Sequence, residues 1–354
     1  MRAVRGGSVR IATRAVSVVM TAVLVAGCSS PPKPPDKVGG VVGGFPADHV
    51  LRLGYVPDVV DSPVLVGLQS GAFTAGLSRM TLQPVAFPSM QAETLALQNG
   101  QLDAAYLDPV AAVIAWQSGR RFPVQIVAGA ASGGVEFVVR KGITGAAQLA
   151  QAKLAAPGGS AQEAAADAWL HEHGLRVLKT SEVAVMPDDA LVREFRSGQI
   201  EGGWEPAPAD AELTAAGGRV LVNEARLWPG GRFATAVLMV TRRFLAHDPG
   251  AVTGLLRGQL QADEFIASRR VSAEAIVQQE LTAKVGSALP AGVLASSFTQ
   301  LSFTENPDAA SVLTEAQHAV AAGLVKPVRS LVGLFDMVPL NQVLRAAHQR
   351  PVSG

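Results

Sequence analysis

The chain has 354 residues, 48% of them hydrophobic, and its 30 Lys and Arg against 29 Asp and Glu leave a formal net charge of +1. A nearly neutral chain without a basic stripe is a poor nucleic-acid binder, and its apolar content is enough for one large or two medium lobes. The single cysteine excludes a disulfide within the chain.

The first 27 residues have the pattern of a secretion signal. Four arginines precede an apolar run, Ala15 to Ala26, that is too short to span a bilayer. The run ends in Val-Ala-Gly before Cys28, which resembles the lipobox of bacterial lipoproteins, where the leader is cleaved and the cysteine is lipidated. We therefore expect a signal peptide over 1–27 and a lipid, labelled by palmitate, on Cys28. Cleavage of this leader would remove four Arg and no acid, so the formal net charge of the mature chain would fall by four, from +1 to −3.

Residues 28–49 are rich first in proline and then in glycine, which predicts a tether. From Val50 onward, short apolar segments alternate with longer helical patterns. The predicted strands are 50–55, 81–87, 102–106, 124–129, 135–140, 153–157, 183–186, 200–204, 219–222 and 236–243. The predicted helices are 62–73, 89–100, 109–119, a short one near Ala146, 160–174, 188–198 and 206–218, followed by mostly helical chain from 244 to 347. This alternation predicts an α/β fold with a parallel or mixed sheet covered on both faces.

One phrase occurs twice, as GQLDAAYLDP at 100–109 and GQIEGGWEP at 198–206. Each copy has a helix-ending glycine, a short strand with an aromatic residue, and an acid followed by proline. We interpret the copies as equivalent strand ends in two lobes, with a chance match as the alternative. Because ligands bind beyond the carboxyl ends of strands, Asp108 and Glu205 are expected at a ligand cleft. Trp204 would cover the ligand or pack in the core.

The sequence contains no motif of a known enzyme class. It lacks a nucleophile elbow, a Walker loop, a dinucleotide-binding glycine motif and a cysteine pair. His171 and His173 would point about 200° apart on a helix, so they cannot share a metal ion. We predict a protein that is not an enzyme and that holds neither metal nor cofactor.

The loops that follow the predicted strands are rich in serine, glycine, proline and acids, and contain no lysine or arginine. Several of them open helices, whose free N–H groups bind anions or are capped by side chains. Residues 132–134 and 159–161 are expected anion-binding nests, and Ser62 and Ser89 are expected helix caps.

Five segments resemble the solute-binding lipoproteins of ABC importers for nitrate, taurine and alkanesulfonates, most closely the actinobacterial sulfonate-binding branch. They are GYVPDVVDSPVLVGLQSGAF (54–73), IVAGAASGG (126–134), APGGSAQEAAADAWLHEHGL (156–175), GQIEGGWEPAPADAELTAAGGRVLVNEARLWPGGRF (198–233) and AVAAGL (319–324). The resemblance implies the type II periplasmic-binding-protein fold, in which two α/β lobes joined by two crossings close on a ligand. With crossings placed near Arg140 and Ala234, lobe I comprises 50–139 and 234–350, and lobe II comprises 140–233.

By this resemblance the protein is expected to be an extracytoplasmic monomer, anchored to the cell membrane by lipid, that captures a small organic solute and delivers it to an ABC permease. The family's ligand contacts carry over to Asp58, Asp61, Ser62, Ser89, Met90, Asp108, Ser132, Gly133, Ser160, Ala161, Gln162, Trp204 and Glu205. A cofactor-pathway enzyme on the same fold and a surface lipoprotein with a vestigial cleft remain alternatives.

The loops depart from the sulfonate-binding pattern at four places. Ser160-Ala161-Gln162-Glu163 stands instead of Asn-Thr-Gln-Asp, and Pro88-Ser89-Met90-Gln91 stands instead of Asn-Ala-Gly-Pro. The first loop has Asp58-Val59-Val60-Asp61-Ser62 instead of Asn-x-Thr-His-Ala, and Leu107-Asp108-Pro109-Val110 replaces Gly-Pro-Asn-Pro. A carboxylate about 4 Å from a sulfonate repels it by about 4 kcal/mol at an effective dielectric near 20, which is about a thousandfold in affinity. A zwitterion or amine-bearing heterocycle, with its donor end on Asp61 or Asp108, is therefore our alternative to a sulfonate or taurine-like solute.

Overall fold

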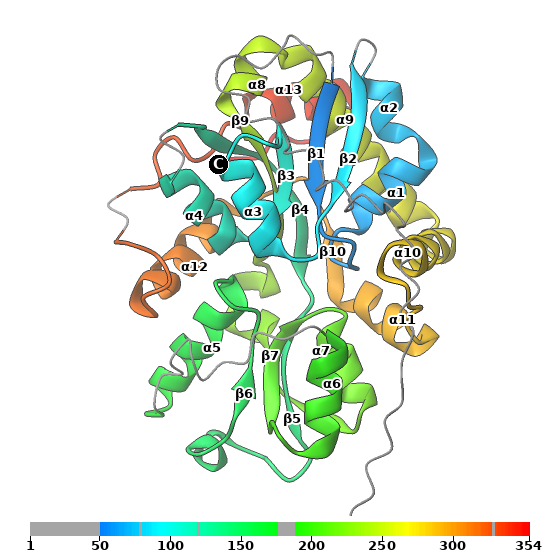
Figure 1. Ribbon diagram of the computed structural model, residues 1–354. Helices are drawn as coiled ribbons and strands as arrows, with labels where there is room; N and C mark the ends of the chain where they lie inside the picture. The colour runs from blue at the N-terminus through cyan, green and yellow to red at the C-terminus, as the bar shows by residue number, and fades with distance from the viewer. Residues whose placement is uncertain (1–49, 78–79, 119–120, 176–187, 328–329) are drawn as a thin grey trace, which may run out of the picture. The chain divides into compact units, whose positions relative to one another are not determined.

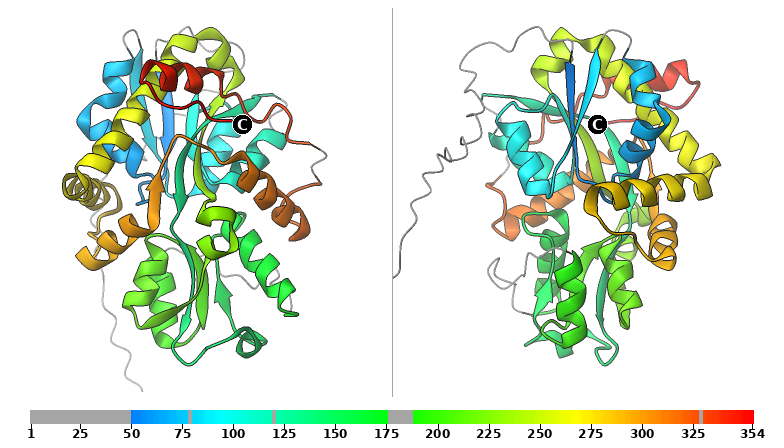
Figure 2. Two further views of the ribbon diagram at one scale, coloured as in Figure 1. Left: turned by 180° about the vertical axis from the view of Figure 1, so that it is seen from behind. Right: turned by 45° about the vertical axis from the view of Figure 1, so that its right-hand side comes forward.

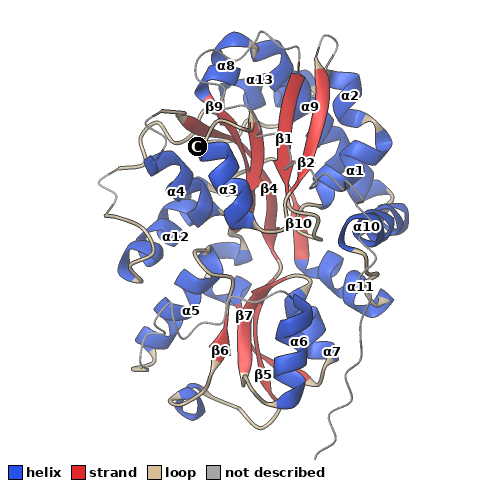
Figure 3. Cartoon of the chain, in the orientation of Figure 1, coloured by secondary structure: helices blue, strands red, loops and turns tan. Residues whose placement is uncertain are grey.

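The computed structural model describes residues 50–77, 80–118, 121–175, 188–327 and 330–354. The predicted signal peptide, Cys28, the tether and the strand expected at 183–186 lie outside these residues. The strands of the described part form two sheets, with the orders β10–β4–β9–β3–β1–β2 and β6–β7–β5–β8 (Figure 1). Helices accompany the strands of both sheets (Figure 3), which confirms the predicted α/β fold. No helix of the described part has the length and hydropathy needed to cross a bilayer.

The six-stranded sheet contains a parallel part and an antiparallel part. Its strands are β1 (Val50–Tyr55), β2 (Thr81–Ala86), β3 (Ala104–Leu107), β4 (Val124–Gly133), β9 (Ala234–Thr241) and β10 (Leu301–Phe303). β2, β1 and β3 run parallel, whereas β9 lies antiparallel between β3 and β4, and β10 is antiparallel to β4. The short strand β10 falls in the region that was expected to be mostly helical.

Helices cover both faces of this sheet. They are α1 (Ser62–Ser70), α2 (Ala72–Gly76), α3 (Met90–Gln98), α4 (Pro109–Ser118), α8 (Arg242–His247), α9 (Pro249–Ser268), α10 (Arg270–Val285), α11 (Ala291–Gln300), α12 (Ala309–Ala321) and α13 (Val338–Ala346). In the right-hand view of Figure 2, α1, α2 and α9 lie on one face and α3 and α4 on the other. The helix predicted at 62–73 is divided, because Gly71 adopts a φ of 76°.

The four-stranded sheet has a hydrophobic cluster on each face. It consists of β5 (Val135–Arg140), β6 (Leu154–Ala155), β7 (Gly202–Pro206) and β8 (Gly218–Asn223). Its helices are α5 (Ala161–Glu172), α6 (Asp188–Ser197) and α7 (Ala209–Ala215), with short 3-10 helices η1 (Ala146–Leu149), η2 (Glu224–Leu227) and η3 (Pro229–Gly231). Because successive strand residues point to opposite faces, Phe137 packs with Trp169 and Trp204, while Val138 packs with Phe195 and Leu213.

The chain passes between the two sheets twice. β4 ends at Gly133 and β5 begins at Val135, so the first passage is at Gly134, before the crossing expected near Arg140. Gly133 and Gly134 have φ angles of 78° and 70°, which few other residues adopt. The return passage runs through residues 224–233, between β8 and β9.

Both copies of the repeated phrase have the predicted glycine and short strand, but only in the first does the acid-Pro pair open the next helix. Gly100 and Gly198, with φ angles of 70° and 79°, follow α3 and α6, and β3 and β7 come next. The copies differ at their ends, since Pro109 starts α4 directly, whereas Ala207 and the cis-linked Pro208 separate β7 from α7.

Candidate functional site

Asp108 connects the two sheets through the N termini of two helices. One of its oxygens, Oδ1, accepts hydrogen bonds from the N–H groups of Val110 (2.8 Å) and Ala111 (3.2 Å) at the start of α4. The N–H of Ala161, the first residue of α5, donates to the same carboxylate at 3.1 Å and 3.2 Å. The Gln162 side chain also hydrogen-bonds to it. One buried carboxylate thus satisfies free N–H groups of two helices.

The nest expected at 159–161 is a helix N terminus, and the N–H groups of Gly159 and Ala161 are occupied by carboxylates of the chain. The buried Ser160 caps α5 by accepting from the N–H of Glu163 (3.2 Å), and Glu163 accepts from the N–H of Gly159 (2.6 Å). Nearby, the Gln91 side chain of α3 donates to the carbonyl of Gly158 (2.7 Å). The expected anion position on α5 is therefore filled by Asp108.

The nest expected at 132–134 lies at the end of β4, where part of the backbone is paired. The N–H of Gly133 donates to the carbonyl of Phe233 (3.2 Å), and Ser132 is paired in register with Ser302 of β10 and Ala234 of β9. Sheet pairing therefore uses part of this backbone, and the ligand contact expected at Ser132 and Gly133 stays a prediction.

The first loop turns its acids back towards the end of β1. Oδ2 of the buried Asp61 accepts from the N–H of Val56 (3.0 Å), and Asp58 accepts from the N–H of Asp61 (2.9 Å). Burial, followed by the charge of Asp58, raises the pKa of Asp61 well above its usual range. Asp61, not Ser62, is the residue that precedes α1, and the Ser62 hydroxyl donates to the carbonyl of Val59.

The second loop matches its prediction. Ser89 caps α3 by accepting a hydrogen bond from the N–H of Ala92 at 3.3 Å. Met90, the first residue of this helix, is half-buried.

Trp204 and Glu205 face opposite sides of β7. The Trp204 side chain, 1% exposed, stacks on Phe137 at 5.2 Å between ring centroids. The Glu205 side chain lies over Gly203, on the other face. The two acids of the repeated phrase, Asp108 and Glu205, therefore have different surroundings.

Two indole N–H groups converge on Glu224, the first residue of η2. Trp204 donates to its Oε2 at 2.5 Å, and Trp228 donates to its Oε1 at 3.1 Å. The buried Glu224 was not predicted as a site residue, although it follows a strand end as Asp108 does.

One face of α12 points towards the return passage. The Ser311 hydroxyl accepts from the N–H of Ala234 at 2.8 Å. Glu315 lies one turn further on the same face and is 2% exposed. Neither carboxylate oxygen accepts a well-formed hydrogen bond, and the nearby Ser311 hydroxyl lowers its pKa. The ring of His318 lies 6.3 Å from that of Trp228, and its Nδ1 is also unpartnered. Neither Glu315 nor His318 was predicted.

We call Asp108, Glu224 and Glu315 the carboxyl cluster. α12, which carries Glu315, packs against both α4 and α5. Among the described residues, no Lys or Arg forms an ion pair with any member of the cluster. The described part also contains no group of three or more His, Cys, Asp or Glu arranged to hold a metal ion.

Burial dominates the electrostatics of the cluster. It raises the pKa of Asp108 to about 6, although the N–H groups of Ala161, Ala111 and Val110 lower it. It raises the pKa of Glu224 to about 7, against the two indole hydrogen bonds and with a contribution from the Asp108 charge. Burial and then the charges of Asp108 and Glu224 raise the pKa of Glu315 well above its usual range, against the Ser311 hydroxyl, which lowers it.

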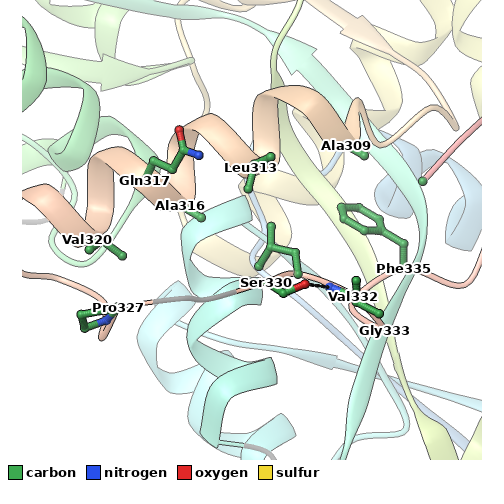
Figure 4. Close-up of a pocket in the computed structure, with 12 residues that line it drawn as sticks. Ala309, Leu313, Ala316, Gln317, Val320, Pro327, Ser330, Val332, Gly333 and Phe335 are labelled. Atoms are coloured by element: carbon green, nitrogen blue, oxygen red, sulfur yellow. Dashed lines mark hydrogen bonds between the residues drawn. The ribbon is translucent and has the colours of Figure 1, made fainter.

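A surface pocket lies on a different face of α12. It has a volume of about 760 Å³ and lies between α12 and a segment that contributes Pro327 and residues 330–333 and 335 (Figure 4). Leu313, Val320 and Phe335 are among its mainly apolar lining, which includes none of the predicted site residues and none of the carboxyl cluster.

Known proteins share the family pattern and the fold. A model of the NMT1-like family matches residues 45–280. The alkanesulfonate-binding protein SsuA of Xanthomonas axonopodis pv. citri bound to MOPS has a TM-score of 0.65 at 20% identity, over 82% of this chain and 98% of that one. The aliphatic sulphonate-binding SsuA of Escherichia coli has a TM-score of 0.65 at 19% identity, over 79% and 90%. A search of curated proteins finds no match.

The nitrate-binding protein NrtA of Synechocystis PCC 6803 has a TM-score of 0.71 at 13% identity, over 86% of this chain and 90% of that one. At such identities, structural likeness identifies the fold alone. It confirms the expected periplasmic-binding-protein fold.

Proposed function

The chain belongs to the NMT1-like family, and from this we propose that it is the solute-binding component of an ABC importer. The fold that it shares with sulfonate- and nitrate-binding proteins supports a solute-binding role. The observation that carries the proposal is the junction at Asp108, where helices from the two sheets meet in a buried polar region. A small molecule enclosed there would contact both sheets and favour their closure.

In this proposal the protein acts outside the cytoplasm as a monomer. Lipid on Cys28 holds it at the membrane, and the solute passes to a permease when the two sheets move apart. The leader and the solitary cysteine support the anchor. A catalytic role finds no support, because the structural neighbours named above are described as binding proteins.

The experiment is identification of the retained solute. We would purify the mature protein from its native cells, denature it, and analyse the released small molecules by mass spectrometry. We expect one compound at about one per chain. Adding this compound back to the emptied protein should change the tryptophan fluorescence emission, since the indole N–H groups of Trp204 and Trp228 donate to Glu224. If no compound is released and no fraction of a cell extract alters emission or thermal stability, the proposal is wrong.

A further inference from the structure

Two hydrogen-bond contacts join the part of the chain around the six-stranded sheet directly to the segment that begins α5. The N–H of Ala161 donates to both carboxylate oxygens of Asp108, at 3.1 Å and 3.2 Å. The side chain of Gln91, in α3, donates to the carbonyl oxygen of Gly158 at 2.7 Å. α5 in turn packs against β7 of the four-stranded sheet. Groups of the chain itself therefore tie the two sheets together.

The two passages between the sheets involve other residues, and there the chain can turn. The N–H of Gly133 donates to the carbonyl of Phe233 at 3.2 Å, and the carbonyl of Gly133 accepts from the Thr235 hydroxyl at 2.5 Å, both beside β9 of the larger sheet. The carbonyl of Gly134 accepts from the N–H of Ala207, which follows β7 of the smaller sheet, at 2.8 Å. The torsion angles of Gly134 thus separate groups bound on one side from a group bound on the other. A rotation there could move the sheets apart and leave these three hydrogen bonds intact, but it would break the two contacts at α5.

The contact of Asp108 is the stronger of the two. Its side chain is 8% exposed, and the N–H groups of Val110 and Ala111 hold its carboxyl group at the start of α4. Hydrogen bonds to a charged group are stronger than neutral ones, and separation of the sheets would take this acceptor from the N–H of Ala161. α12 also packs against α5, and α11 against α7 (Figure 1), which adds contacts across the same junction.

We propose that Asp108 and Gln91 form a latch that keeps the two sheets together in solution even without a solute, so that the molecule opens only when the hydrogen bonds between Asp108 and Ala161 break. Entry and exit of a solute would then depend on the latch. The latch goes beyond the proposed function and does not depend on which solute is bound.

Single-molecule energy transfer between dyes on the two sides of the latch measures opening. Leu95 in α3 and Glu172 at the end of α5 are exposed, and each would be replaced by cysteine for labelling. The mature protein would be unfolded and refolded to remove any solute. It would be measured at a pH of about 7.5, where Asp108, whose pKa burial raises to about 6, is ionised. A sample with the native Cys28 alone gives the labelling at that residue. We expect most wild-type molecules in one high-transfer population.

Two variants weaken the latch and a third is the matched control. Asp108→Ala should raise the ratio of open to closed molecules at least about tenfold, because the N–H of Ala161 loses a charged acceptor. Gln91→Ala removes one neutral hydrogen bond and should raise the ratio about fivefold. Gln98→Ala should leave the ratio at the wild-type value. The Gln98 side chain is also in α3, but it donates to the Ser118 hydroxyl of α4, on the same side of the junction, at 2.7 Å.

Wild-type protein that is mainly open without a solute, or an unchanged ratio in Asp108→Ala, would overturn the latch. If Asp108→Ala does not refold, Gln91→Ala compared with Gln98→Ala decides, and equal ratios in these two variants would overturn it. Open wild-type protein that closes when its retained solute is added would also overturn the latch, and would leave the proposed function in place. Closed wild-type protein that neither releases nor rebinds any compound would support the latch and contradict the proposed function.

Discussion

Asp108 and Glu315 show that burial of a carboxyl group has different consequences in different settings. Asp108 accepts hydrogen bonds from N–H groups of two helices, so its carboxyl group joins the two sheets, although burial raises its pKa to about 6. Glu315 has only the Ser311 hydroxyl beside it and no well-formed hydrogen bond, so burial of its carboxyl group is largely uncompensated. Removal of the first should destabilise the protein, and removal of the second should not.

We expect Asp108→Ala to lower the free energy of unfolding by about 2–4 kcal/mol, since three buried N–H groups lose their acceptor. Thr241→Ala is a suitable control. Thr241 caps only α8, through the N–H of Phe244 at 3.2 Å, and its loss should cost about 1 kcal/mol. Urea unfolding of both variants measures the difference, and equal losses would contradict a role of Asp108 beyond capping one helix.

Local sequence was enough to predict some site residues and not others. Ser89 was identifiable as a cap, and Asp108 as a strand-end residue, because these roles depend on neighbours in the chain. Glu315 lies in the middle of a helix whose sequence is otherwise ordinary. Only the packing of α12 against α4 and α5 distinguishes it from a surface acid. Trp204 shows the same limit, because its neighbours Phe137 and Trp169 are distant in the chain.

At the scale of elements, α2 and α9 approach each other through a pair of glycines. A Cβ atom at Gly254 would lie 2.2 Å from the carbonyl oxygen of Gly76, and one at Gly76 would lie 2.3 Å from that of Gly254. Backbone atoms cannot move aside as flexible side chains can. The two helices can therefore pack at this distance only with glycine at both positions.

Gly254→Ala should destabilise the protein by about 2–3 kcal/mol, because the two helices must separate. The control lies in the same helix, at the exposed Gly250, where a Cβ atom would meet nothing within 4 Å. There alanine should stabilise by about 0.5–1 kcal/mol. Urea unfolding would test both variants. An unchanged free energy of unfolding in Gly254→Ala would show that α2 and α9 can move apart without loss of stability.

The order of the helices and strands could be predicted largely from hydrophobic periodicity, whereas details that depend on pairing could not. β10 has three residues, too few for a periodic signal, and it forms because its backbone pairs with that of β4. The passage at Gly134 was placed too late because β4 and β5 are separated by a single residue. Nothing in the apolar pattern marks which of these two strands joins which sheet.

For the whole molecule, the buried acids predict greater stability at acidic pH. Burial raises the pKa of Asp108 to about 6, that of Glu224 to about 7 and, together with the charge of Glu136, that of Asp210 to about 8. The folded state therefore holds protons that the unfolded chain releases near pH 4. This contribution is complete below that pH and is lost as the pH rises through 6 to 8.

Calorimetry should accordingly show a melting temperature at pH 8.5 that is about 5 °C or more below that at pH 5.5. Asp210→Asn should reduce the dependence between pH 7 and 8.5, because the side chain that titrates highest of the three is replaced by a neutral amide. A melting temperature that increases across this range would show that these carboxyl groups are not protonated in the folded protein.

The proposed anchor is also tested on the whole chain. Radiolabelled palmitate fed to the native cells should label the wild-type protein and leave Cys28→Ala unlabelled, since Cys28 is the only cysteine. If the two proteins were labelled equally, the lipid would not be attached to Cys28, and the proposed anchor would be wrong.

The central position of β9 has a consequence for how the polypeptide is made. β9 fills the space between β3 and β4, yet more than a hundred residues separate it from the end of β3. A nascent chain that has emerged only as far as residue 233 contains β1 to β8. The four-stranded sheet can therefore assemble while the six-stranded sheet still lacks its strand β9. Ribosomal synthesis must therefore reach at least Thr241 before the larger sheet can close, and until then its unpaired edges are open to chaperones or to aggregation.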